Sequence, residues 1–214
     1  MKTLLAISKA IDALTERVGG IMAVIVILTI LAGFANAFLR KLSGAIGQTL
    51  ITNQLIQAQW YLFSLLFLLG FPYILKHNVN VRVDFLYAKW GPRQRALVDF
   101  VGTLLFLLVF CAIGLYTAWG PVLTSFGRLP DGSFSGEWEV SADAGGLTIA
   151  PLKALILVGF ALMLLQAFSQ LIKYFMILTG YKDADVEAAV MKAETDQAMA
   201  EELAAQLKAE GKLG

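Results

Sequence analysis

The stretch "VGGIMAVIVILTILAGFANAFL", residues 18–39, runs for 22 positions without a charged side chain. At a rise of about 1.5 Å per residue, it forms a helix about 33 Å long, which spans the ~30 Å hydrocarbon core of a bilayer. Ala35-Asn36-Ala37 has the small-x-small form of a signal-peptide cleavage site. The apolar run is too long for a signal sequence, however, and acidic residues precede it. We therefore expect an uncleaved transmembrane helix and keep cleavage as the less favoured alternative.

Three further apolar stretches are long enough to cross a membrane. One centres on residues 60–75 and begins earlier, in "NQLIQAQ"; the others cover about residues 96–119 and 154–172, the last extending at both ends. The chain is 58% hydrophobic and 15% charged, whereas about a quarter of a soluble domain is charged. Backbone groups in lipid must be bonded within their own segment, which favours helices. The sequence predicts an all-α membrane protein with four transmembrane helices.

The remaining segments are assigned by composition. Residues 1–17 are predicted to be a cytoplasmic amphipathic lead-in that lies along the membrane surface, with an apolar face made of Leu4, Leu5, Ile7, Ile11 and Leu14. Residues 18–180 form the membrane domain. Residues 181–214 are rich in Ala, Glu and Lys and are predicted to be a charged cytoplasmic tail, either a solvated helix or partly disordered.

Positive charge sets the predicted orientation. If the N-terminus is cytoplasmic, the inside segments carry ten basic residues: Lys2, Lys9, Arg17, Lys76, Arg82, Lys89, Arg93, Arg95, Lys173 and Lys182. The outside segments then carry four: Arg40, Lys41, Arg128 and Lys153. Both termini should therefore be cytoplasmic.

A charged break, residues 75–95, separates the second and third spans and is predicted to be a cytoplasmic amphipathic segment. Asp84 could cap a short helix over residues 85–90, which Gly91-Pro92 would end. Trp90 and the neighbouring cations suit the lipid headgroup layer. Two interpretations stay open: a positive-inside loop with interfacial anchors, or a docking surface for a partner subunit that includes Arg82.

Polar residues inside the spans favour helix packing over chemistry. Asn36, Gln57 and Gln59 lie near the outer ends of two spans, and Gln166, Gln170 and Lys173 repeat along the fourth. No charge sits at a bilayer midplane, so interhelical hydrogen bonds are favoured over an ion path. The single histidine, His77, and the single cysteine, Cys111, argue against haem ligation and disulfide chemistry. We predict no catalytic residue, metal or cofactor, and the near-zero net charge suggests no nucleic-acid partner.

Two blocks carry a family resemblance. Gln57 to Tyr87, with "QWYLF" at residues 59–63, Gly70 and "VRVD" at residues 81–84, resembles the small membrane subunit of tripartite ATP-independent periplasmic (TRAP) transporters. A second block, from Trp138 through "GGL" at residues 145–147, is similar to the same family and includes Ser141, Pro151, Lys153, Gly159, Phe160 and Gln166. The chain departs from the pattern at Gln57, where an acidic residue is frequent, and at Asn80, where a histidine is frequent.

The resemblance implies a function and partners. A periplasmic solute-binding protein would deliver an organic acid, often a carboxylate, to a large membrane subunit that moves it by an elevator-like motion driven by sodium. This chain would brace that subunit in the bacterial inner membrane, among membrane lipids. Its candidate subunit or lipid interface is Gln57, Gln59, Trp60, Arg82, Asp84 and Trp90, and its candidate contact with the binding protein is Glu137, Trp138 and Glu139. Alternatives are a membrane anchor or assembly subunit of a redox complex, and a self-sufficient channel or carrier.

Overall fold

A computed structural model describes residues 1–48, 53–78, 90–143 and 146–181. The helices are α1 (Lys2–Ile46), α2 (Asn53–Lys76), α4 (Pro92–Gly102), the π-helical turn η1 (Thr103–Leu107), α5 (Leu108–Ser125) and α6 (Ala150–Thr179). Because α4, η1 and α5 follow one another without a break, they form one long helix. Four helices are thus long and apolar enough to cross a membrane. The prediction of an all-α protein with four spans is confirmed for the described residues.

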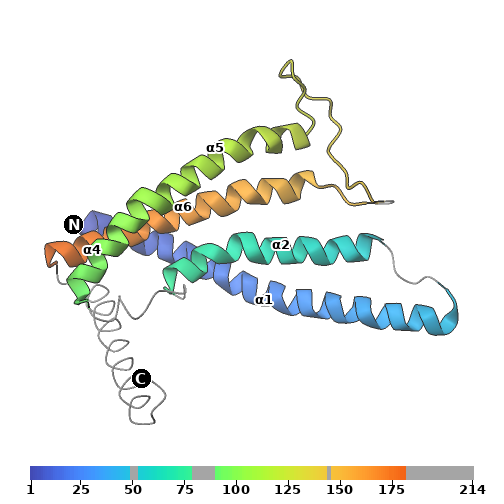
Figure 1. The fold of residues 1–214 in the computed structure, drawn as a ribbon, viewed down its shortest axis with the longest axis horizontal. Helices are drawn as coiled ribbons and strands as arrows, with labels where there is room; N and C mark the ends of the chain where they lie inside the picture. The colour runs from blue at the N-terminus through green and yellow to red at the C-terminus, as the bar shows by residue number, and fades with distance from the viewer. Residues whose placement is uncertain (49–52, 79–89, 144–145, 182–214) are drawn as a thin grey trace, which may run out of the picture.

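The helices form a bundle that is closed at one end and open at the other (Figure 1). We call the end that holds Lys2 and Thr179 the terminal end, and the end that holds Asn53 and Ala150 the loop end. Helix α6 contacts α1, α2, α4, η1 and α5, so it is the central helix of the bundle. Toward the loop end, the α1–α2 pair separates from the α5–α6 pair (Figure 1).

Glycines bring the helices together at three crossings. Gly19 of α1 lies against the ring of Tyr73 of α2, too close for a methyl group to fit. A Cβ atom on Gly159 of α6 would lie 2.9 Å from the Leu68 carbonyl oxygen of α2. Small residues at such crossings allow close helix approach, which lipid-embedded helices need because lipid tails offer no hydrophobic driving force. Gly114 of α5 makes a similar crossing with Phe160 of α6.

The predicted lead-in is continuous with the first span. Helix α1 runs unbroken from Lys2 to Ile46, so residues 2–17 are helical and form its first turns. Of the predicted apolar face, Leu4, Ile7 and Leu14 are exposed, whereas Leu5 is buried and packs against Met176 of α6. Ser8 and Thr15 are buried on the same side as Leu5 and form hydrogen bonds to α6.

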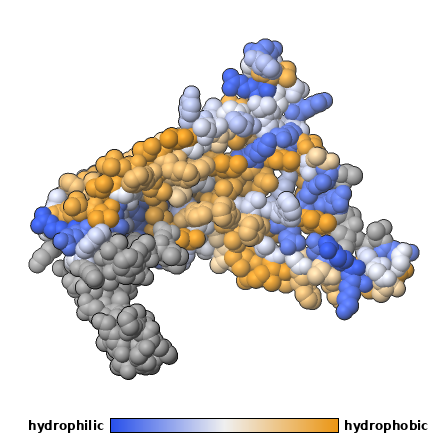
Figure 2. All heavy atoms as spheres, viewed as in Figure 1, coloured by the Kyte–Doolittle hydropathy of each residue, from blue (hydrophilic) through white to orange (hydrophobic). Residues whose placement is uncertain are grey.

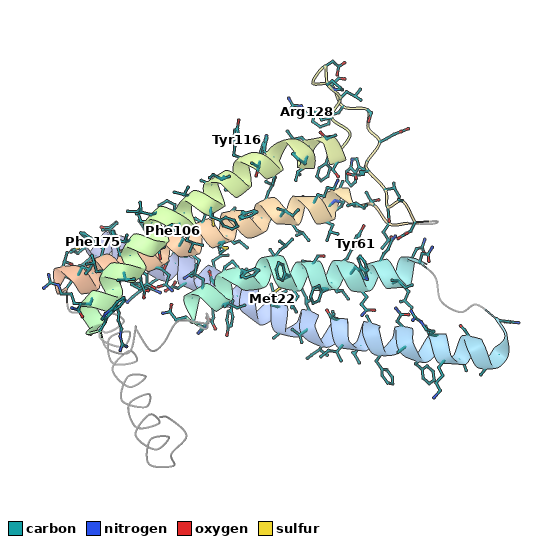
Figure 3. The ribbon with its side chains drawn as sticks, viewed as in Figure 1. Met22, Tyr61, Phe106, Tyr116, Arg128 and Phe175 are labelled. Atoms are coloured by element: carbon teal, nitrogen blue, oxygen red, sulfur yellow. The ribbon has the colours of Figure 1, made fainter. Side chains whose placement is uncertain are left out.

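The outer surface of the bundle is apolar (Figure 2). Phe106 is 74% exposed and Tyr116 is 85% exposed, and Figure 3 shows Tyr116 projecting away from α6. Hydrophilic residues gather at the two ends of the bundle (Figure 2). Continuous apolar surface of this extent is typical of contact with lipid or with another membrane protein.

Candidate subunit interface

The candidate interface residues fall into three places. Gln57, Gln59 and Trp60 lie in the first two turns of α2 at the loop end. Glu137, Trp138 and Glu139 lie in the long loop, residues 126–149, at the same end. Trp90 is half-buried at the terminal end, just before α4. Arg82 and Asp84, the predicted short helix up to residue 89, and the predicted tail from residue 182 lie outside the described residues.

Gln57 fastens the long loop to α2. Its Nε2 donates hydrogen bonds to Ser141 Oγ at 2.7 Å and to Asp143 Oδ2 at 2.8 Å, and its Oε1 accepts one from the Leu147 backbone N–H at 2.6 Å. One turn later, the Tyr61 hydroxyl donates to the Thr148 carbonyl oxygen at 2.6 Å. Gln57 is buried, and an amide supplies both donors and acceptors to such a contact. The polar atoms of the Gln57 side chain therefore form hydrogen bonds within this chain.

Glu139 ties the same loop to the ends of two helices. Its Oε2 accepts hydrogen bonds from Lys153 Nζ of α6 at 2.5 Å and from the Ser125 hydroxyl of α5 at 2.7 Å. The bond from Lys153, followed by that from Ser125, lowers the pKa of the Glu139 carboxyl below its ordinary value. Of the three predicted contact residues, Glu139 is thus engaged within the chain, while Glu137 keeps an exposed side chain.

The tip of the loop is held by short backbone contacts. Isolated antiparallel bridges join Arg128 to Phe134 and Val140 to Thr148. Trp138 packs edge-on against Phe126 with ring centroids 5.1 Å apart, yet it is 52% exposed. Figure 3 shows the loop around Arg128 standing beyond the end of α5. This combination of a fastened base and an exposed aromatic tip suits contact with another protein.

Gln59 joins α2 to α1. Asn36 Nδ2 of α1 donates a hydrogen bond to Gln59 Oε1 at 3.3 Å, while Asn36 Oδ1 is buried and has no partner within the described ranges. The next residue, Trp60, is largely exposed. The predicted polar contact between the two spans is therefore present. Within the described ranges, the Asn36 amide nitrogen has a partner and its carbonyl oxygen has none.

A polar cluster at the terminal end was not predicted. Its centre is Asp12, whose Oδ1 accepts hydrogen bonds from Ser169 Oγ at 2.8 Å and Gln166 Nε2 at 3.0 Å, and whose Oδ2 lies 2.5 Å from Lys173 Nζ. Thr15 donates to Gln166 Oε1 at 2.6 Å. Because every one of these groups has a partner, the cluster locks α1 to α6 instead of forming a conduction path.

The same cluster reaches α2. Lys76 pairs with Glu16 and donates to the Asp12 carbonyl oxygen at 3.1 Å. His77 Nε2 lies 3.2 Å from Glu16 Oε2. Gln170 Nε2 of α6 donates to the Leu75 carbonyl oxygen at 3.1 Å, close to the C-terminus of α2 where such donors are needed. Three helices thus meet through polar groups at this end.

A sequence signal for this cluster exists. Ser8, Asp12 and Thr15 are spaced i, i+4, i+7, which places them on one helix face. Gln166, Gln170 and Lys173 have the same spacing and were singled out from the sequence. Matching the two stripes would have predicted that α1 packs on α6.

The described residues offer no grouping suited to metal chemistry, since no three His, Cys, Asp or Glu side chains among them lie close enough to hold an ion. Cys111 is fully buried in α5. The polar groups described above join helices to one another and fasten the loop.

The comparisons with known proteins identify the family. The sequence profile described as "Tripartite ATP-independent periplasmic transporters, DctQ component" matches residues 29–176. No curated protein and no solved structure gives a significant match. The matched region contains α2, α4, η1 and α5 in full, most of α6 and the long loop. The chain therefore belongs to the DctQ family, the small membrane component of tripartite ATP-independent periplasmic transporters.

Proposed function

We propose that this chain is the stationary small subunit of a sodium-driven, binding-protein-dependent transporter for organic acids, with carboxylates as the main class. The family assignment carries the proposal, because it implies assembly with a large DctM subunit and a solute-binding protein. In this assembly, the large subunit moves the substrate and this chain braces it in the bacterial inner membrane.

The internal bonding of the bundle supports the bracing role. A brace for a moving partner must keep its own helices in fixed positions, and buried, fully bonded polar networks make a helix arrangement rigid. Asp12 connects α1 to α6 through three side chains, and Gln57 fastens the long loop through three hydrogen bonds. These groups are occupied within the chain, so a substrate would have to compete with them.

The distribution of basic residues supports the proposed orientation. The terminal end, with Lys76 and Lys173, faces the cytoplasm, and the long loop faces the periplasm. The exposed Glu137 and Trp138 then lie on the side where a solute-binding protein arrives. Trp90, with Arg82 and Asp84 outside the described residues, lies at the cytoplasmic headgroup layer, where it contacts lipid or the large subunit.

Reconstitution tests the proposal. Proteoliposomes that contain this chain, the large subunit and the binding protein should accumulate a carboxylate from a radiolabelled panel when an inward sodium gradient is imposed. Omitting any one of the three components should abolish uptake, and collapsing the sodium gradient should do the same. Sodium-dependent uptake by this chain alone would contradict the bracing role, and uptake driven without sodium would contradict the proposed coupling ion.

A further inference from the structure

The outer half of α2 forms one side of an open groove. A first opening of about 260 Å³ lies between α1 and α2, and a second of about 300 Å³ lies between α2 and α6. Phe63 and Ser64 line both openings, so the two adjoin on the same stretch of α2. Thr29 borders the groove on α1, and Ile156 borders it on α6.

A row of aromatic side chains runs along this groove. Trp60, Phe63 and Phe67 are spaced i, i+3, i+7, which places them on one helix face. They are 71%, 59% and 53% exposed. Phe71 continues the row and packs edge-on against Phe67, with ring centroids 4.7 Å apart. From Trp60 to Phe71 the row is about 17 Å long at 1.5 Å per residue, roughly half the thickness of the hydrocarbon core.

The groove also contains polar groups that hydrocarbon cannot satisfy. The Gln59 amide and the Ser64 hydroxyl line it. An acyl chain has no donor to offer, whereas Ser, Thr, Asn and Gln side chains form hydrogen bonds between membrane helices. The groove is therefore better suited to a protein helix than to lipid tails.

The outward face of η1 and α5 provides the contrast. Val109, Ile113 and Tyr116 are exposed there. The Thr117 hydroxyl on the same helix donates to the Ile113 carbonyl oxygen of its own helix at 2.8 Å. An apolar surface whose nearby hydroxyl is already satisfied is suited to lipid.

We propose that the groove along α2, defined by Gln59, Trp60, Phe63, Ser64 and Phe67, receives a transmembrane helix of the large subunit that carries a hydrogen-bonding side chain opposite Gln59. The aromatic row supplies contact area at low entropic cost, and the Gln59 amide sets the register of the incoming helix. This inference rests on the proposed function, because it takes its occupant from the same complex.

Site-specific photo-crosslinking in the full complex tests the occupant directly. A benzoylphenylalanine is placed at Phe63 in the groove or at Tyr116, an exposed position of α5 that lines neither opening, and the chain is co-expressed with the large subunit. We expect an adduct with the mass of both subunits from position 63 and at least tenfold less from position 116. An adduct at position 63 with phospholipid only, or with a second copy of this chain, overturns the inference.

A steric variant gives an independent measurement. Ser64→Trp fills the junction of the two openings and should reduce the amount of large subunit that co-purifies by at least tenfold. Leu105→Trp, at an exposed position of η1, is the matched control and should leave recovery unchanged. Equal recovery with both variants overturns the inference. If the Ser64→Trp chain is not monodisperse when purified alone, the crosslinking result decides.

Different results would contradict the proposed function and the groove assignment. If the wild-type chain does not retain the large subunit at all, the proposed function fails. If the wild-type complex forms but position 63 crosslinks no more than position 116, only the groove assignment fails.

Discussion

The terminal end and the loop end of the bundle are held together by different means. At the terminal end, Asp12, Gln166, Ser169 and Lys173 satisfy one another between α1 and α6. At the loop end, no comparable side-chain network is found between α2 and α6 within the described residues, and the long loop connects them through Gln57 and Glu139. One end is thus closed by the chain itself, and the other keeps an open groove. The difference indicates that the loop end is where this chain has room for a partner.

The largest expected effect follows from breaking the terminal-end cluster. Asp12→Ala leaves the half-buried Lys173 without its counter-ion and removes the acceptor for Ser169 and Gln166. Loss of this ion pair and of two hydrogen bonds costs about 3 kcal/mol in total, so we expect the largest fall in the thermal midpoint of the purified chain in detergent. Asp131→Ala, which removes an exposed acceptor for Ser133 in the long loop, is the control and should change the midpoint little. Similar midpoints for the two variants would refute a stabilising role for the cluster.

The coupling within that cluster can be measured separately. Asp12→Ala and Lys173→Leu combined should destabilise the chain by less than the sum of the two single variants, because the double variant leaves no unpaired charge. Additive effects would mean that the two side chains do not depend on each other.

Helices α2 and α6 cross where the closed half of the bundle ends. A substitution at this crossing should lower the stability of the chain by a smaller amount. Gly159→Ala places a methyl group 2.9 Å from the Leu68 carbonyl oxygen, so the helices must shift apart. Overpacking of this kind costs about 2 kcal/mol. Gly120→Ala, where the added carbon meets nothing within 4 Å, should keep or raise stability because alanine favours helix. The contrast is measured as thermal midpoints, and a stable Gly159→Ala chain would show that the crossing tolerates separation.

Weakening the loop fastening should act locally. Gln57→Leu removes the acceptor for the Leu147 backbone N–H, a loss of about 1–1.5 kcal/mol, or roughly tenfold in local opening. We expect amide hydrogen exchange at Leu147 to accelerate by that factor while exchange in α6 is unchanged. Gln54→Leu, an exposed amide in the same turn of α2, should not alter exchange at Leu147. Slow exchange at Leu147 in the Gln57→Leu chain would contradict the fastening.

The smallest effect concerns pH at the loop end. The pKa of the Glu139 carboxyl is lowered in the folded chain, so its stabilising contribution is fully present above the ordinary value of 4.5 and is lost as the pH falls through the lower folded-state value. Limited proteolysis of the long loop should therefore accelerate only below pH 4.5. Glu139→Gln should be cleaved faster at neutral pH and should lose this pH dependence. A wild-type loop that opens well above that pH would assign the transition to another group.

Local patterns in the sequence predicted the spans well where apolar runs dominate. The early start of α2 among amides and the extension of α6 at both ends follow from side-chain composition alone, and both are found. How residues 1–17, with Asp12 and Glu16 among them, pack on the other helices does not follow from these patterns. The charges of those two residues are compensated by Lys173 and Lys76, which are distant in the sequence, so only the packed structure reveals the pairing.

The candidate interface shows the same limit. The sequence singled out Gln57 and Glu139 as interface candidates, but it could not tell that both bond within the chain, because their partners depend on how the loop folds back. Trp60, by contrast, is exposed on its helix, while Gln59 is half-buried and bonds to Asn36. Exposure follows from local helix geometry once the span is known, whereas hydrogen-bond partners across a loop do not.

Helix α1 has a mechanical consequence. Its 45 residues make a rod about 68 Å long, more than twice the ~30 Å hydrocarbon layer. A helix of fixed length adapts to a thinner or thicker bilayer by changing its tilt. Because Asp12 links α1 to α6, a change in the tilt of α1 is transmitted to the central helix. The tilt of the whole subunit therefore depends on the thickness, and so on the lipid composition, of the surrounding bilayer.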